Sequence, residues 1–434
     1  MDLISNKSNE LKGEVKLPGD KSISHRAAII LPLCHGDAVV NNFLFAEDTV
    51  NTLNVMKMLN ARIKIRENGI HINSNGINGL KKANKLLYVG NSGTSIRLLS
   101  GLLSALDGKF VLYGDNSLQK RPMKRIIKPL NLMGARIKSL YDNDLAPLII
   151  DGGRLKGIEY NMEVPSAQVK SALLLAGLFA EGKTAVEEIQ KTRDHTERML
   201  KFLGADISIE DNIINIKSGN YLLAKDIDIP GDISSAAFII AAAALTENSE
   251  IIIHDVLLNE TRTGFIDIFK MMGGEIEIIQ HGISNNEPTG SIIIKSSKLR
   301  GIKISDEFIP RLIDEIPLIS VLAAFADGET IIHDAKELRY KESDRIKSII
   351  HNLNIMGTHV EEFEDGMLIR GNTYTKKDEY NFESFDDHRI AMAFSLVGLI
   401  LGNTKVIGCE NVRTSFPEFV QILASLGAKI YSIY

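Results

Sequence analysis

Two kinds of apolar segment recur along the chain, and both predict helices. The first kind consists of small and aliphatic residues on every side, which is typical of a helix buried all round. It occurs six times, at Ala27–Leu33, Ile96–Leu106, Val169–Ala180, Ala236–Leu245, Ile316–Ala326 and Ile390–Leu401. The second kind is amphipathic, with apolar residues at i, i+3, i+4 and i+7, as in Ile346, Ile349, Ile350 and Leu353. Short alternating segments that follow, such as 275–278, predict strands.

Each amphipathic helix ends at a Gly-like position that marks a repeat. These positions are Asn60, Gly134, Gly204, Gly273, Gly357 and Gly427, spaced by 74, 70, 69, 84 and 70 residues. Asn is the usual substitute for Gly at a left-handed helix C-cap, so Asn60 fits the series. A period near 70 residues has the size of a compact subdomain, and each repeat has the order β-α-β-α-β-β. We therefore predict an α/β fold with six repeats, arranged as two domains of three.

Composition narrows the class of protein. The chain has 434 residues, 44% of them apolar, and its 50 Lys and Arg against 55 Asp and Glu give a net charge of −5. No global basic field therefore favours nucleic acid or an anionic membrane. Its start lacks a secretory signal pattern, and its apolar stretches are too short to span a bilayer. Cys34 and Cys409 form neither a disulfide framework nor a metal-ligand spacing. We expect a soluble cytoplasmic protein with no metal and no cofactor.

The polar segments that precede the six buried helices are the candidate functional sites. A helix start offers unpaired N–H groups and the positive end of its dipole, and anions bind there. If the three buried helices of each domain run the same way, their starts converge on the cleft between the domains. The six segments are Pro18–Ser22, Gly90–Thr94, Pro165–Gln168, Gly231–Ser235, Leu312–Glu315 and Phe385–Arg389.

Cations at these helix starts call for an explanation. Lys21 and Arg26 oppose the helix dipole, which a bound phosphate or carboxylate would offset, although a solvated cap is an equal alternative. His25 reads as an ordinary helix-face residue. The Gly90–Thr94 glycines allow close approach to a ligand, but such clusters also make plain turns. In the basic run 120–125, usually a solvated pattern, Arg121 before Pro122 is the member expected to be held extended at a site.

Acids accompany these cations in the second half of the chain. Lys341 and Arg345 stand at i, i+4, and Glu342 shares a helix face with Arg345, as an exposed salt-bridged helix start would also do. Asp314 either acts as a buried base with a raised pKa or caps its helix, and for Asp232 we expect capping. No Walker motif, dinucleotide fingerprint, nucleophile elbow or metal set is present. The inventory suits two anionic substrates and acid–base chemistry.

Together these motifs resemble the 5-enolpyruvylshikimate-3-phosphate (EPSP) synthase family over essentially the full length. The matching segments are Leu17–Arg26, Gly90–Thr94 with Arg97, Arg121–Met123, Pro165–Gln168, Lys341–Arg345 and Asp387–Arg389. The resemblance implies a two-lobed enolpyruvyl transferase fold, an inside-out α/β barrel. Because the N-terminal strand of the family belongs to the second lobe, we expect one lobe at 20–228 and the other at 1–19 plus 229–434.

The resemblance also implies a reaction and a set of residues. The enolpyruvyl group of phosphoenolpyruvate would pass to the 5-hydroxyl of shikimate 3-phosphate through a tetrahedral intermediate, in a monomer without cofactor. Asp314 would be the base, Glu342 the acid and Lys21 a helper in proton transfer. Shikimate 3-phosphate would contact Lys21, Ser22, Arg26, Ser166, Ala167, Gln168, Arg193, Asp314 and Lys341. Phosphoenolpyruvate would contact Lys21, Gly93, Arg121, Gln168, Arg345 and Arg389.

Two features bear on how this chain departs from the family pattern: the first concerns phosphoenolpyruvate binding, and the second concerns the herbicide glyphosate, a possible inhibitor. Many relatives have a Lys near the C-terminus that helps to bind phosphoenolpyruvate, whereas here Thr414 takes that place and Arg413 is one position off. The segment 192–197, which contains Arg193, resembles the glyphosate-tolerant bacterial subclass. Gly93, where that subclass can have Ala, leaves room for the herbicide. The two signals point in opposite directions on sensitivity.

Two alternatives remain at this stage. The sister enzyme that transfers enolpyruvyl to UDP-N-acetylglucosamine has the same architecture, but it typically has Lys-Asn where this chain has Lys21-Ser22, and usually a Cys near Arg121. A non-catalytic phospholigand-binding protein of this fold would be expected to lose its acids first, yet both Asp314 and Glu342 are present.

Overall fold

The computed structural model describes residues 1–83 and 85–434. Its Cα packing divides the chain into two units. The first unit comprises Met1–Pro18, Pro230–Gly282 and Pro288–Tyr434, and the second comprises Gly19–Ile229 with Ile283–Glu287. The chain therefore passes between units at 18–19 and 229–230, and the tip of one hairpin, Ile283–Glu287, belongs with the second unit.

Each unit contains three four-stranded sheets in the described residues, and all six share one spatial order. In the second unit they are β14 (Ile227–Asp228), β3 (His35–Asn41), β5 (Gly69–Asn75), β4 (Arg62–Arg66); β6 (Leu87–Tyr88), β7 (Gly108–Tyr113), β9 (Leu148–Gly152), β8 (Arg136–Ser139); and β10 (Glu159–Asn161), β11 (Lys183–Glu187), β13 (Ile213–Lys217), β12 (Asp206–Glu210).

The first unit has three sheets of the same kind. They are β16 (Ile276–Ser284), β17 (Glu287–Lys295), β15 (Glu250–Leu257), β2 (Lys12–Lys16); β18 (Lys303–Ile304), β19 (Glu329–Ile332), β21 (Met367–Arg370), β20 (His359–Glu362); and β22 (Tyr380–Glu383), β23 (Thr404–Ile407), β1 (Asp2–Asn6), β24 (Lys429–Ile433). Each of the six sheets contains one parallel pair, and its other described pairs are antiparallel.

Three of the repeats have a strand that comes from elsewhere in the chain. Three repeats follow the predicted order β-α-β-α-β-β within one sheet, as β6 to β9 do. The repeat that begins at β2 has its first strand in the sheet of β15, and β14 takes that place beside β3. In the last repeat β1, from the opposite end of the chain, pairs with β23 and β24.

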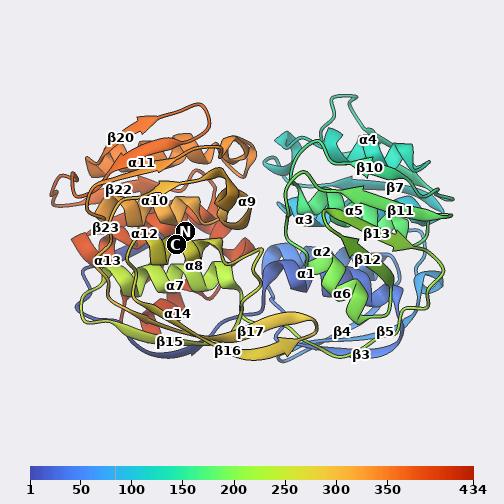
Figure 1. Ribbon diagram of the computed structural model, residues 1–434, viewed down its shortest axis with the longest axis horizontal. Coiled ribbons are helices and arrows are strands. Elements are labelled where there is room, and N and C mark those ends of the chain that lie inside the picture. The colour runs from blue at the N-terminus through green and yellow to red at the C-terminus, as the bar shows by residue number, and fades with distance from the viewer. Residues whose placement is uncertain (84) are drawn as a thin grey trace. The chain divides into compact units, whose positions relative to one another are not determined.

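The six apolar helices form the cores of the units, inside the sheets (Figure 1). They are α1 (Lys21–Ile30), α3 (Gly93–Ala105), α5 (Ala167–Gly177), α7 (Ile233–Leu245), α10 (Ile316–Phe325) and α12 (His388–Ser395), which α13 (Val397–Leu401) extends. Most begin several residues earlier than their apolar runs predict. A Cβ on Gly101 of α3 would lie 2.1 Å from the carbonyl oxygen of Ala172 in α5, so glycine permits this close helix packing.

The amphipathic helices end as the sequence predicts. They are α2 (Glu47–Met58), α4 (Lys124–Leu132), α6 (His195–Phe202), α8 (Gly264–Met271), α11 (Arg345–Met356) and α14 (Phe419–Ser425), and the short α9 (Ile309–Leu312) precedes α10. The predicted C-cap positions all have positive φ, from 72° at Asn60 to 103° at Gly427. The left-handed turn predicted from sequence is therefore confirmed in all six repeats.

Candidate active site

Polar side chains cap five of the six core helices. The side-chain oxygens of Asp20, Ser92, Ser166, Asp232 and Asp387 each accept a hydrogen bond from a backbone N–H in the first turn, at 2.7–3.4 Å. The capping role predicted for Asp232 is confirmed. The candidate cations therefore stand within or beside first helical turns whose other N–H groups point outward.

Arg26 is a buried cation in α1 of the second unit. Its Nε donates to Thr196 Oγ1 at 2.7 Å, its Nη1 to the Ser22 carbonyl at 3.0 Å, and its Nη2 to Ser171 Oγ at 2.9 Å. The residue is 3% exposed, and no carboxylate of the described residues lies within ion-pairing distance. Burial lowers its pKa to about 10.

The donor geometry of Arg26 fits a planar anion. A guanidinium has five N–H groups, and the three bonds above leave one on each Nη atom. Donors on the two Nη atoms of one guanidinium can bind a carboxylate in a bidentate manner. The positive charge of Arg193, two residues before α6, also lowers the pKa of Arg26, so the two predicted ligands lie in one electrostatic environment.

Lys21 lies at the start of α1 and makes a different contact. Its Nζ is 2.6 Å from Oδ2 of Asp48, and the two side chains are 20% and 7% exposed. Ser22, the next residue, is half-buried. The lysine charge is therefore held at the helix start by an acid of α2 that sequence reasoning did not single out.

Gly93 begins α3 between two guanidinium groups. A Cβ at this position would lie 3.2 Å from Nη1 of both Arg97 and Arg121. Arg97 donates to Gln168, which in turn donates to the hydroxyl of Thr94 at 3.0 Å, and Arg121 donates to Asn91. Two cations at a helix N-terminus make a strong local site for phosphate.

The remaining candidates of the second unit are also placed by helix starts. Ser166 caps α5, Ala167 is its first residue, and Gln168 follows. Of the basic run, Arg121 is 7% exposed whereas Lys120 and Lys124 are exposed. The choice of Arg121 from that run is consistent with its burial.

Three carboxylates surround Arg345 in the first unit. Its Nε donates to Oδ2 of Asp387 at 2.8 Å, its Nη2 to Oε2 of Glu342 at 2.7 Å, and its Nη1 to Oδ1 of Asp314 at 3.3 Å. Burial alone lowers the pKa of this side chain, but the three acids outweigh burial and raise the pKa above its ordinary value. Arg345 is 1% exposed and holds both candidate catalytic acids.

Asp314 does not cap its helix. Glu315 is the residue that precedes α10, and the Asp314 carboxylate instead accepts from Lys341 Nζ at 3.1 Å and from Arg345. The side chains of Asp314 and Glu342 are 18% and 17% exposed, so neither acid is fully buried. Of the two roles left open for Asp314, capping is therefore wrong.

Arg389 and Arg413 differ in their surroundings. Arg389 of α12 is 12% exposed at its side chain, places Nη1 3.4 Å from Oε1 of Glu315, and lies over the Phe238 ring at 5.9 Å. Arg413 is exposed and donates to the Tyr434 hydroxyl at 3.0 Å, while Thr414 bonds the backbone nearby. The guanidinium of Arg413 thus contacts Tyr434 and not one of the candidate acids described above.

Sequence reasoning missed the partners that orient these cations. Thr196 and Ser171, which hold Arg26, are 170 and 145 residues away from it, and their hydroxyls lie 2.7 Å apart. The contacts of Asp48 with Lys21 and of Glu315 with Arg389 were also not predicted, because these residues too are distant in sequence. No spacing rule relates such distant positions, although the polar segment 312–315 already contained Glu315.

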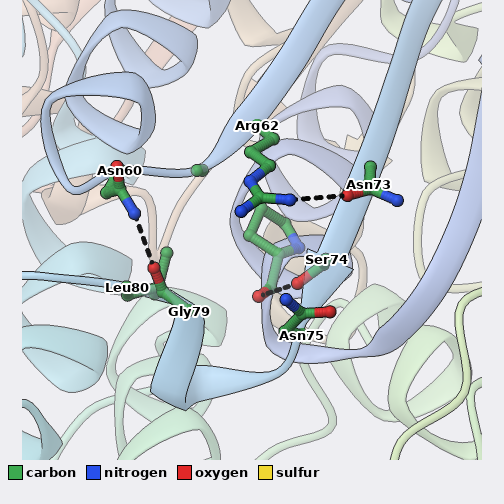
Figure 2. A pocket seen from close by; sticks show the side chains of 9 residues that line it. Asn60, Arg62, Asn73, Ser74, Asn75, Gly79 and Leu80 are labelled. Atoms are coloured by element: carbon green, nitrogen blue, oxygen red, sulfur yellow. Dashed lines mark hydrogen bonds between the residues drawn. The ribbon is translucent and has the colours of Figure 1, made fainter.

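A small pocket elsewhere in the second unit does not contain buried cations at a helix start. It holds about 30 Å³, room for about one water molecule, between the end of α2 and the β4–β5 hairpin. Figure 2 shows Asn60 donating to the Gly79 carbonyl and Arg62 donating to Asn73, at 3.0 and 3.3 Å. The polar groups of this pocket hydrogen-bond one another. The starts of the core helices therefore remain the candidate site.

Within residues 1–83 and 85–434, no helix is long and apolar enough to cross a membrane. The same residues contain no group of three or more His, Cys, Asp or Glu side chains placed to hold a metal ion.

Comparison with known proteins identifies the family of this chain. A family model described as EPSP synthase (3-phosphoshikimate 1-carboxyvinyltransferase) matches residues 5–423. The chain is 49% identical over 430 residues to the 3-phosphoshikimate 1-carboxyvinyltransferase of Thermodesulfovibrio yellowstonii, which covers 98% of this chain and 100% of that protein. This chain belongs to the EPSP synthase family.

Further members and structures extend the family likeness. The Thermoanaerobacter sp. enzyme of the same name is 46% identical over 420 residues, 96% of this chain and 98% of its own. The structure of EPSP synthase from Acinetobacter baumannii has a TM-score of 0.88 at 43% identity and covers 99% of both chains. The enolpyruvyl transferase NikO from Streptomyces tendae, with a TM-score of 0.80 at 15% identity, shows the fold alone. The predicted family and fold class are confirmed.

Proposed function

We infer that this chain transfers the enolpyruvyl group of phosphoenolpyruvate to the 5-hydroxyl of shikimate 3-phosphate and releases phosphate. This is the carboxyvinyl transfer of the shikimate pathway, which leads to chorismate and the aromatic amino acids. Family membership supports the reaction. The single structural observation that carries it is Arg26, a buried guanidinium with one N–H group on each Nη atom left for an anion.

We propose that the residues assigned by family resemblance bind the two substrates. Arg26 and Arg193 would take the carboxylate or phosphate of shikimate 3-phosphate, with Lys21, Ser22, Ser166, Ala167, Gln168, Asp314 and Lys341. The guanidinium of Arg121 beside Gly93 would take phosphoenolpyruvate, with Lys21, Gln168, Arg345 and Arg389. The support is that cations cluster at helix starts in both units. One cation alone would not offset the desolvation of such substrates.

The proposed chemistry uses the two acids that Arg345 holds. Asp314 accepts the proton of the 5-hydroxyl as the hydroxyl oxygen attacks C2 of phosphoenolpyruvate. Glu342 donates a proton to the C3 methylene carbon. This gives a tetrahedral phosphate ketal, from which phosphate leaves while a proton returns from the methyl group to the enzyme. Lys21 assists these proton transfers. The cations stabilise charge that develops on carboxylate and phosphate oxygens.

Further proposals concern the form of the enzyme and its inhibition. We propose lobes at 20–228 and at 1–19 plus 229–434, and a cytoplasmic monomer, since one chain supplies both charged sets. Glyphosate, with a phosphonate and a carboxylate, would compete with phosphoenolpyruvate for the cations around Gly93. Membership of the tolerant subclass rests on the segment 192–197, whose Thr196 hydroxyl accepts from Arg26.

Phosphate release tests the proposed function. Purified protein is given phosphoenolpyruvate and shikimate 3-phosphate, with each omitted in turn. Release that needs both substrates is expected. Release with UDP-N-acetylglucosamine in place of shikimate 3-phosphate would transfer the assignment to the sister enzyme. No release with either acceptor, from a folded protein that binds shikimate 3-phosphate, would indicate a binding protein.

A further inference from the structure

A buried polar cluster in the first unit surrounds Glu315. The Ser234 hydroxyl donates to Oε1 of Glu315 and accepts from Nη2 of Arg262 at 2.9 Å. The same Arg262 nitrogen lies 3.4 Å from Oδ1 of Asp232, and Nη1 of Arg389 lies 3.4 Å from the same Oε1 of Glu315 that Ser234 contacts. The side chains of Arg262, Asp232 and Glu315 are 3%, 8% and 3% exposed. The cluster holds two acids and two arginines.

Glu315 is used in an unusual way for a residue at a helix start. It occupies the N-cap position of α10, yet its side chain makes no capping hydrogen bond. It bonds instead to a hydroxyl of α7 and to an arginine of α12, 81 and 74 residues away. A buried carboxylate is costly unless it is paired, so the contacts of this side chain are what offset its burial.

The geometry leaves Arg389 fixed on two sides and open on the others. Glu315 engages one N–H of the guanidinium, and the Phe238 ring lies against its face. Among the described residues no other side chain bonds this guanidinium, so four of its five N–H groups are available. Arg345 differs, because three carboxylates engage four of its N–H groups.

We propose that Glu315 is a positioning residue, which holds the Arg389 guanidinium so that its remaining N–H groups face an anion. This rests on the proposed function, in which Arg389 binds phosphoenolpyruvate. Ser234 bonds the same carboxylate oxygen and is itself held by Arg262, so that the orientation of Arg389 depends on α7 and α10 as well as on α12. Glu315 itself touches no substrate.

The test separates positioning from simple stability. Glu315→Gln keeps the size and one acceptor oxygen but removes the negative charge, so the ion pair with Arg389 is lost and the hydrogen bond from Ser234 becomes a neutral one, about half as strong. We expect the KM for phosphoenolpyruvate to rise about tenfold, while kcat and the KM for shikimate 3-phosphate stay close to those of the wild type. Ser234→Ala, which leaves Glu315 and Arg389 in contact, should raise the same KM by a smaller factor.

Glu188→Gln in the second unit is the matched control. Glu188 is also a buried acid, 5% exposed and 2.9 Å from Lys170, so its loss should lower the melting temperature without changing the KM for phosphoenolpyruvate. If Glu315→Gln behaves like this control, Glu315 is merely structural. If it lowers the KM for phosphoenolpyruvate, its charge opposes the anion. Either result overturns the proposal.

A second readout does not depend on turnover. Inorganic phosphate should raise the melting temperature of the wild type and of Glu188→Gln, and raise that of Glu315→Gln much less. If the wild type releases no phosphate from the two substrates, the proposed function fails, but this comparison still decides whether Glu315 supports anion binding at Arg389. An equal rise in all three proteins would contradict the positioning role.

Discussion

Replacing Arg26 by methionine separates the binding role of this cation from its role in folding. Methionine has a similar length, no charge and no need for hydrogen bonds. Burial lowers the pKa of Arg26 to about 10, more than two units below the ordinary arginine value. Since each pKa unit corresponds to about 1.4 kcal/mol, the buried charge opposes folding by about 3 kcal/mol. The cost is fully present at neutral pH and disappears only as the pH rises above about 10.

The hydrogen bonds lost in the variant are worth a similar amount. Three bonds at about 1 kcal/mol each contribute about 3 kcal/mol. Two of the acceptors, Thr196 and Ser171, already lie 2.7 Å apart and can bond each other. The two contributions nearly cancel, so Arg26→Met should change the free energy of unfolding by less than about 2 kcal/mol.

Substrate binding should change far more. Loss of two charge-assisted hydrogen bonds to a carboxylate costs about 3 kcal/mol or more, which raises the KM for shikimate 3-phosphate about 10²-fold. Urea unfolding gives the stability, and initial rates of phosphate release give the KM. Arg198→Met is the control, because Arg198 of α6 is paired with Asp194 at 2.8 Å and has no proposed substrate contact.

Two results would refute the reasoning about Arg26. Loss of more than about 4 kcal/mol of stability in Arg26→Met would show that the guanidinium is held for the fold. An unchanged KM for shikimate 3-phosphate in a well-folded variant would show that its two remaining N–H groups meet no substrate.

Three further predictions follow from the same contacts. Glu342→Gln should lower kcat about 10²–10⁴-fold with both substrates still bound, and near-normal turnover would exclude Glu342 as the acid. Gly93→Ala places a methyl group 3.2 Å from the guanidinium of Arg121. The inhibition constant for glyphosate should rise, and the KM for phosphoenolpyruvate should rise by a smaller factor. Equal factors for the two constants would contradict this prediction. Burial and neighbouring cations hold the pKa of His25 well below its ordinary value, so the unfolded chain binds the extra proton and stability falls as pH drops below about 6.5, by about 1.4 kcal/mol per pH unit. Urea unfolding at pH 7.5 and at pH 5, about one unit or more either side of that ordinary pKa, measures the loss of stability. Between these two pH values the free energy of unfolding should fall less in His25→Asn than in the wild type. An equal fall in both proteins would show that His25 is not the group concerned.

Local signals predicted the parts of the fold that local physics determines. The left-handed C-caps, including Asn60, were predictable because Gly accepts positive φ at the lowest cost and Asn is its usual substitute at a helix end. The core helices were recognised, but all their starts except that of α10 were placed too late, since the polar residues of the first turn do not belong to the apolar run. Lys21 and Arg26 are thus inside α1.

Long-range contacts were beyond this reasoning. The sequence alone did not show that Arg345 holds both acids and Asp387, 42 residues away, or that β2 and β14 exchange sheets. Such pairings follow from chain topology, which a single sequence reveals only through resemblance to a family. The roles of Asp314 and Glu342 came from that resemblance, and their shared partner came from the structure.

The most direct test of the central claim is the identity of the product. After incubation with phosphoenolpyruvate and shikimate 3-phosphate, NMR of the recovered acceptor should show an enolpyruvyl ether at the 5-hydroxyl, with one phosphate released per ether formed. Phosphate release without this ether, or an ether at another hydroxyl, would contradict the account of the two cation sets and of the acids that Arg345 holds.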